Sequence, residues 1–239
     1  MADQISDILQ GRPARYAVNA PLVAPETLAV IGPYLDVALV AGSLATQLAD
    51  GQLKDVRIEY LGDIAEYDTT VLRAGVIRGL LAPISEENVT VVNAAMVAEK
   101  RGLNLSEVKS TATNGYPNLL KVSLRTSAGT TSVAGTIEHS RPHIVSINEL
   151  SVDITETDAW LLICENQDQP GTIGAVGTLL GGLDLNISSM RVGRTAKRGR
   201  ALMVLEVDEP LSDEHLAAVR QLTNIESARV VRLGSHARP

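Results

Sequence analysis

Residues 159–232 decide the fold, and they begin AWLLICENQDQPGTIGAVGTLLGGLDLNISSMRVGRTAKRGRALMVLEV from Ala159 to Val207. Alternating β-branched runs and one amphipathic run at helical spacing predict strands and helices in turn. The predicted elements are strand 159–165, helix 171–182, strand 185–192, strand 200–207, helix 213–222 and strand 225–232. This βαββαβ order within about 75 residues is typical of the ferredoxin-like arrangement.

The preceding segment predicts a second domain of mixed α and β structure. Helical patterning over 27–49 is divided at Pro33, and strand 54–60, helix 69–81, short strand 90–92 and helix 94–100 follow. Residues 105–154 then read as a meander of short strands separated by turn sequences. The fold class is therefore α+β: an α/β domain over 22–154, a polar boundary, and the βαββαβ domain over 158–234.

The first 21 residues do not complete either domain. Asp3–Gln10 predicts a short amphipathic helix, followed by an extended linker that ends at Pro21. Eight residues do not hold a helix alone, so its apolar face needs a partner. We expect residues 1–21 to be a residual helix and hinge from a larger unit.

Composition excludes several classes of protein. The 239 residues carry a formal net charge of −7 and only 3% aromatic side chains, which disfavours nucleic-acid binding by charge or by stacking. The sequence has neither an apolar run of about 18 residues nor a secretory signal, so we expect no membrane partner and a cytoplasmic location. One cysteine, Cys164, excludes an internal disulfide framework and predicts a small buried core residue.

Enzymatic templates are absent from the sequence. No P-loop, dinucleotide-binding fingerprint or nucleophile elbow occurs, so we assign no catalytic residue and no cofactor. His139 and His143 have the four-residue spacing of zinc ligands on a helix. Pro142 lies between them in a strand-rich stretch, which favours two turn histidines and no metal site.

The most suggestive local feature joins the first strand to the first helix of the βαββαβ unit, at residues 166–171. Free backbone N–H groups at a helix start attract a carboxylate, while Asp168 could accept an ammonium group. We expect Asn186, at the start of the next strand, to reach the same end of the sheet as Asn166. The alternative, equally open on these grounds, is that Asp168 and Pro170 cap the helix.

Five cations, which run from Arg191 to Arg200, occupy the turn before the strand 200–207. They predict either an anion-binding or docking patch or, as we favour, a solvated hairpin tip.

The sequence also resembles known families. Residues 171–180, 185–187 and 190–194 are similar to ACT domains, the small-molecule sensors of amino-acid metabolism. Residues 61–69, 74–81, 92–95 and 100–102 resemble the intervening, or allosteric substrate-binding, domain of the D-3-phosphoglycerate dehydrogenase family. Residues 2–21 look like the last helix and hinge of that family's catalytic half.

The resemblance implies a regulatory portion of a serine-biosynthesis oxidoreductase. The catalytic residues and the NAD site of the family would lie before Met1, so no dehydrogenase chemistry is expected in this chain. ACT domains of the family pair side by side and bind L-serine at the interface, which implies a homodimer or homotetramer. By motif position, the serine ligands would be Asn166, Asp168, Gly171, Asn186 and Ile187.

The intervening domain of the family binds anions or substrate, which implies a site for 3-phosphoglycerate or another anion. Arg125 and Arg141 are its candidate ligands. Iron–sulfur serine dehydratases combine similar domains, but one cysteine cannot hold their cluster. The alternative function is a serine-insensitive structural module that only mediates oligomerisation.

Overall fold

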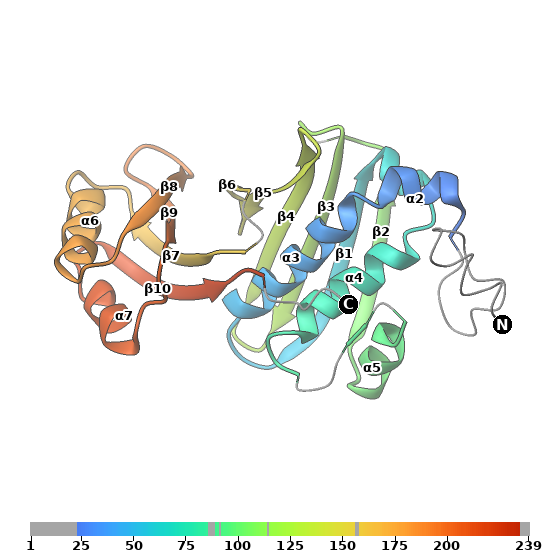
Figure 1. The fold of residues 1–239 in the computed structure, drawn as a ribbon, viewed down its shortest axis with the longest axis horizontal. Coiled ribbons are helices and arrows are strands. Elements are labelled where there is room, and N and C mark those ends of the chain that lie inside the picture. The colour runs from blue at the N-terminus through green and yellow to red at the C-terminus, as the bar shows by residue number, and fades with distance from the viewer. Residues whose placement is uncertain (1–22, 86–88, 91, 114, 156–157, 235–239) are drawn as a thin grey trace, which may run out of the picture.

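The computed structural model describes residues 23–85, 89–90, 92–113, 115–155 and 158–234. The predicted helix 3–10 and the hinge to Pro21 lie outside these residues. The chain forms two sheet-containing parts that lie side by side (Figure 1).

The N-terminal part is a six-stranded sheet covered on one face by helices. Its order is β2-β1-β3-β4-β5-β6, in which β1 and β2 are parallel and the other neighbours antiparallel. The strands are β1 (Leu53–Gly62), β2 (Asn104–Ser110), β3 (Asn118–Thr126), β4 (Thr130–Glu138), β5 (Arg141–Ile147) and β6 (Leu150–Ile154). The helices are α2 (Pro25–Ile31), α3 (Tyr34–Leu48), the 3-10 turn η1 (Asp63–Glu66), α4 (Thr70–Leu81) and α5 (Ala94–Lys100).

Helices α2 and α3 meet at Pro33, as predicted, with a bend of 52°. In the part of the chain that the structure describes, no single helix is long and apolar enough to span a membrane; the bent pair has the length and apolar composition only when its two helices are counted together. The pairing of α3 with α4 depends on glycines: a Cβ on Gly42 would stand 2.5 Å from the Val76 carbonyl oxygen. Close backbone approach therefore sets the spacing of the two helices.

The predicted strand at 90–92 is wrong for its two described residues. Thr90 is not in a strand and Val92 lies in a turn. The Thr90 backbone N–H donates to Asn93 Oδ1 at 2.7 Å, and Ala94 N–H donates to the Thr90 carbonyl at 2.9 Å. These local hydrogen bonds turn the chain into α5 instead of extending it.

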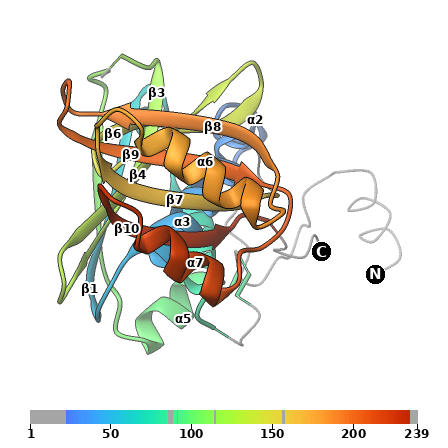
Figure 2. The same ribbon diagram turned by 90° about the vertical axis from the view of Figure 1, so that its left-hand side faces the viewer.

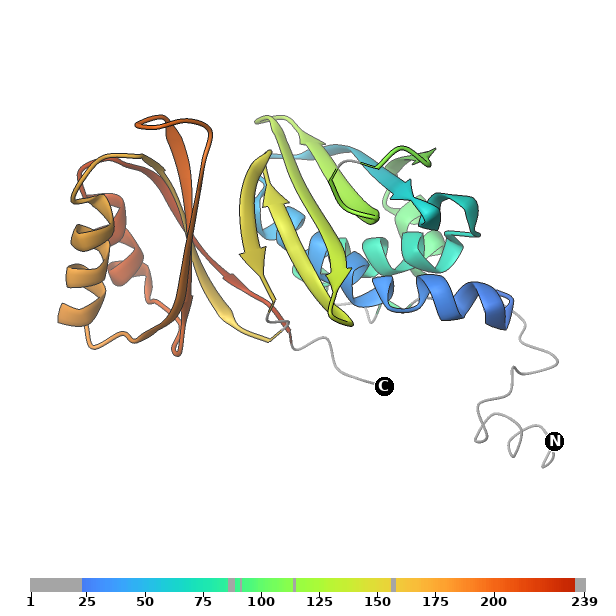
Figure 3. The same ribbon diagram turned by 90° about the horizontal axis from the view of Figure 1, so that it is seen from above.

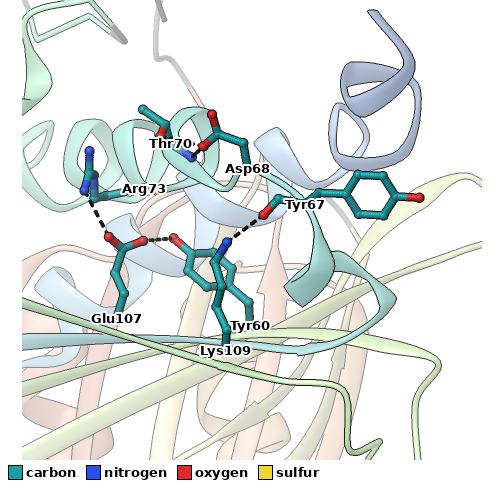
Figure 4. Close-up of polar contacts among 7 residues, drawn as sticks. All are labelled: Tyr60, Tyr67, Asp68, Thr70, Arg73, Glu107 and Lys109. Atoms are coloured by element: carbon teal, nitrogen blue, oxygen red, sulfur yellow. Dashed lines mark hydrogen bonds and ion pairs between the residues drawn. The ribbon is translucent and has the colours of Figure 1, made fainter. Parts of the chain in front are cut away.

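A polar cluster fastens the edge strand β2 to β1 and α4 (Figure 4). The buried Tyr60 hydroxyl donates to Glu107 Oε2 at 3.0 Å, and Arg73 Nη1 donates to Glu107 Oε1 at 3.0 Å. Burial and the Glu107 carboxylate raise the pKa of Tyr60, so its hydroxyl stays protonated and donates. Lys109 Nζ, from the same strand, donates to the Tyr67 carbonyl at 2.6 Å.

The C-terminal part has the predicted ferredoxin-like topology, with sheet order β10-β7-β9-β8. Its elements are β7 (Trp160–Gln167), α6 (Thr172–Gly182), β8 (Ile187–Arg194), β9 (Arg200–Val207), α7 (Asp213–Arg220) and β10 (Ile225–Arg232). Both helices cover one face of the sheet, and β8 is an edge strand (Figure 2).

The other face of this sheet packs on the N-terminal part, next to β5 and β6 (Figure 3). One continuous core contains Ile147 and Leu150 from the first sheet together with Leu161 and Ile163 from the second. Backbone contact is close as well, because a Cβ on Gly193 would collide with the Ser151 carbonyl oxygen. The two parts therefore share buried apolar surface.

Candidate functional site

Asn166 occupies the last helix-facing position of β7, where the chain turns toward α6. The period-2 alternation places it on the same face as Leu162 and Cys164, which form the core under the helices. Asn166 is only 3% exposed, and its Nδ2 donates to the Gln167 carbonyl at 3.0 Å. Its Oδ1 is buried without a hydrogen-bond partner in the described part of the chain. An unsatisfied buried acceptor is costly, so this oxygen would gain from a further hydrogen-bond donor.

Asp168 binds the β8–β9 turn and does not cap α6. Its Oδ2 accepts from Arg194 Nη1 at 2.7 Å and from the Arg198 backbone N–H at 3.0 Å. The Arg194 guanidinium and the Arg198 amide hold the pKa of Asp168 below its usual value. Of the two open interpretations of this segment, helix capping by Asp168 is therefore wrong.

The start of α6 lacks a side-chain cap. Its N-cap is Gly171, with φ of +90°, and no side chain of the described residues accepts from the first turn. An open pocket of about 420 Å³ lies here, lined by Asp168, Gly171, Ile173, Arg194, Lys197 and Arg198. The amide groups and the positive end of the helix dipole suit a carboxylate.

Asn186 and Ile187 lie at the opposite end of the same sheet. Ile187 pairs with Val207, which in turn pairs with Trp160 at the start of β7. The Asn186 side chain donates to Asp208 Oδ2 at 2.7 Å. The prediction that Asn186 reaches the end that holds Asp168 is thus wrong within one chain, because antiparallel register reverses the strand ends.

All five cations of the turn are exposed, as expected for a solvated hairpin tip, and three of them lie within ion-pair distance of carboxylates. Besides the Arg194 contact, Arg191 Nη2 lies 3.1 Å from Asp153 Oδ2 of the N-terminal part. Arg200 Nη2 lies 3.9 Å from Glu165 Oε1. Sequence reasoning found this cluster but not its carboxylate partners, which come from distant strands.

Arg125 and Arg141 do not form one anion site. Register places Arg125 opposite Thr130 and Arg141 opposite Glu138, so they lie at opposite ends of β4. Arg125 instead lines an open pocket with Arg57 and is paired with Asp55. Arg57 and Arg125 lie on neighbouring strands but far apart in the sequence, so their spacing did not reveal that they meet.

The described residues contain no group of three or more metal-binding side chains. His143 Nδ1 lies 3.3 Å from Asp153 Oδ1 and 4.0 Å from Glu138 Oε2, and His139 lies in the β4–β5 turn. Burial raises the pKa of the Cys164 thiol to about 12, as expected for a core residue.

Comparison with known proteins identifies both parts. Residues 30–148 match the D-3-phosphoglycerate dehydrogenase intervening domain, and residues 160–224 match the ACT domain. Proteins named D-3-phosphoglycerate dehydrogenase from Synechocystis and Bacillus subtilis are each 35% identical over 98% of this chain. The chain spans 42% and 44% of their lengths.

Solved structures add a distant likeness. The ACT domain from the GTP pyrophosphokinase of Chlorobium tepidum is 16% identical, covers 31% of this chain and all of its own, and has a TM-score of 0.26. A homoserine dehydrogenase from Thiobacillus denitrificans is 12% identical, covers 48% of this chain and 34% of its own, and has a TM-score of 0.27.

Proposed function

The chain belongs to the D-3-phosphoglycerate dehydrogenase family through its intervening and ACT domains, and from this premise we propose that it is a regulatory module that binds L-serine between two copies. The observation that carries the proposal is the strand–helix junction 166–171: Asn166, a buried amide with an unpaired oxygen, lies at the end of the strand that leads into α6, and Asp168 and Gly171 line the open pocket at the start of that helix, although Asn166 itself does not. The ligand carboxylate would bind the helix start, and its ammonium group would bind Asp168.

The position of Asn186 supports a site shared by two chains. Strand β8 is a free sheet edge, and a two-fold axis would pair two such edges antiparallel. The start of β8 in one copy then lies opposite the end of β8 in the other. Asn186 and Ile187 of the partner subunit would thus approach Arg194 and Asp168 of the first chain.

The exposed face of helix α6 also supports pairing of two copies of the chain. Ile173 is 50% exposed, and a Cβ on Gly174 or Gly177 would meet nothing within 4 Å in the described chain. A face of small residues allows two helices to pack closely, so a homodimer would cover it. Pairing of these dimers into a tetramer stays a prediction.

The charge on Asp168 agrees with ammonium binding. Both of its hydrogen bonds end on Oδ2, which leaves the second carboxylate oxygen for a ligand. Two further cations, Lys197 and Arg198, line the same pocket and would favour the ligand carboxylate.

The test is isothermal titration of L-serine into the purified chain, with D-serine and glycine as comparison ligands. We expect saturable heat that is selective for L-serine and is lost in Asp168→Asn, while Asp213→Asn, at the start of α7, keeps it. Sedimentation should show dimers for all three proteins. Equal L-serine affinity in Asp168→Asn and the unmodified chain would refute the assignment of Asp168.

A second candidate follows from the free edge and the small-residue face alone. If these surfaces pair without any ligand, the chain is a structural oligomerisation module. Stable dimers that give no heat with L-serine would favour this candidate. A site for 3-phosphoglycerate or another anion in the intervening domain of this chain stays a proposal, and so does NAD-dependent oxidation of 3-phosphoglycerate by a protein that holds such a module.

A further inference from the structure

A separate pocket of about 210 Å³ lies between the two parts of the chain. Its apolar lining consists of Leu48 and Ile147 from the N-terminal part and Ile163 and Leu202 from the C-terminal sheet. Ala128 and Gly129, from the turn between β3 and β4, also line it, and their small size leaves the junction incompletely filled. Pockets at domain junctions are common ligand sites.

Charged groups of both signs line the polar side of this pocket. Ser227 lies opposite Glu165 and Arg229 lies opposite Ile163, so Glu165 and Arg229 are diagonal neighbours on one face of the sheet. The Ser227 hydroxyl donates to Glu165 Oε2 at 3.1 Å, which orients the carboxylate. The Arg229 guanidinium is paired with Asp50 of the N-terminal part.

Size and charge together select the ligand class. At about 30 Å³ for each water-sized group, the volume holds roughly seven non-hydrogen atoms. The lining holds two carboxylates, Asp50 and Glu165, and one guanidinium, and Arg200 approaches Glu165 from outside the lining at 3.9 Å, so the charges balance and do not favour a phosphate or a dicarboxylate. A neighbouring anion and cation instead match a molecule with an ammonium and a carboxylate on one carbon.

We propose that this junction pocket binds a small zwitterionic α-amino acid, with its carboxylate on Arg229 and its ammonium group on Glu165. The site is distinct from the one at the start of α6, since the two share no residue. The ligand carboxylate competes with Asp50 for Arg229. Asp50 and Arg229 belong to different parts of the chain, so a bound ligand weakens the ion pair that joins the two parts. By linkage, a change in the packing of the two parts alters the affinity for the ligand.

The experiment is an NMR titration of the ¹⁵N-labelled full chain with glycine, L-alanine, L-serine and inorganic phosphate. We expect saturable shifts of the Gly129, Thr130 and Ser227 amides with amino acids and not with phosphate. Glu165→Gln keeps the size of the side chain and should weaken binding about tenfold or more. Asp50→Asn removes the carboxylate that competes for Arg229 and should tighten binding. A variant that merely lost structure would bind more weakly.

Two controls separate this site from the others. Arg57→Gln removes an exposed arginine outside the pocket and should leave the titration unchanged. Asp168→Asn removes the proposed serine site at α6 and should also leave the junction shifts unchanged. Three results would overturn the proposal. The first is that the shifts do not saturate at about 10 mM of any amino acid. The others are an affinity that neither Glu165→Gln nor Asp50→Asn alters, and saturation by phosphate.

Discussion

Tyr60 shows how one hydroxyl can hold an edge strand in place. The phenol is fully buried and its hydrogen bond ends on the Glu107 carboxylate of β2, which Arg73 also binds. Hydrogen bonds to charged groups contribute about 1.5–3 kcal/mol. We expect Tyr60→Phe to lower the free energy of unfolding by that amount in urea titrations.

Tyr67 provides the matched control for this prediction. Its ring points away from Glu107, while its backbone carbonyl accepts from Lys109 (Figure 4). Tyr67→Phe should therefore change stability by less than about 0.5 kcal/mol. If both variants lost the same stability, the Tyr60–Glu107 hydrogen bond would not fasten β2.

The lowered pKa of Asp168 predicts that the β8–β9 turn is sensitive to acid. Because the pKa of Asp168 is lowered in the folded protein, its contacts with Arg194 and Arg198 stabilise the turn above the unfolded pKa of about 4. This stabilisation is lost as the pH falls through the lower, folded pKa. In an NMR pH titration the Arg198 amide should shift in this acid range, and Asp168→Asn should abolish the transition.

At the scale of residues, local patterning selected the strand–helix junction 166–171 as a candidate site but not the residues that approach it from other strands. Asn166, Asp168 and Gly171 as serine ligands follow from the family resemblance, and they stay a prediction. The role of Asp168 was open, because Arg194 reaches it from the far end of another strand. Asn186 was misplaced, since sheet register is a tertiary property.

At the scale of elements, glycines in α3 and α4 make the helix pair possible. A Cβ on Gly42 would lie 2.5 Å from Val76 O and 2.9 Å from Leu80 N. Gly42→Ala should therefore lower the free energy of unfolding by about 1–3 kcal/mol despite the better helix propensity of alanine. Thermal or urea unfolding measures this change.

The control is Gly182→Ala at the end of α6, which helical spacing places away from the face of Ile173, Gly174 and Gly177 and where an added Cβ meets nothing within 4 Å in the described chain. This variant should be neutral or slightly stabilising. A stable Gly42→Ala variant would mean that α3 and α4 are not in close backbone contact.

Helices and strands with a clear period were predicted well, as the βαββαβ unit and the break at Pro33 show. The strand predicted at 90–92 was wrong because Thr90 donates hydrogen bonds to the Asn93 side chain and so forms a turn that a β-branched run does not reveal.

At the scale of the whole molecule, the shared core predicts cooperative unfolding. Gly193 allows β8 to approach Ser151 of β6, and a side chain there would force the two parts apart. In calorimetry the unmodified chain should show one transition. Gly193→Ala should lower its midpoint by about 2 °C or more, or divide it into two.

Glu209→Ala, an exposed change in the turn after β9, is the control and should leave the transition unchanged. An unaltered transition in Gly193→Ala would argue against the contact. This packing of the two parts could not be predicted, because the residues that meet are far apart in sequence and only the fold aligns them.

The central claim, a ligand site shared by two chains, is tested most directly by complementation. Asp168→Asn and Asn186→Ala chains are each titrated with L-serine, then mixed, allowed to exchange subunits and titrated again. Each variant alone should give no saturable heat. The mixture should recover about a quarter of the sites, since half of the dimers are mixed and each holds one intact site. No recovery on mixing, with subunit exchange demonstrated, would contradict the claim.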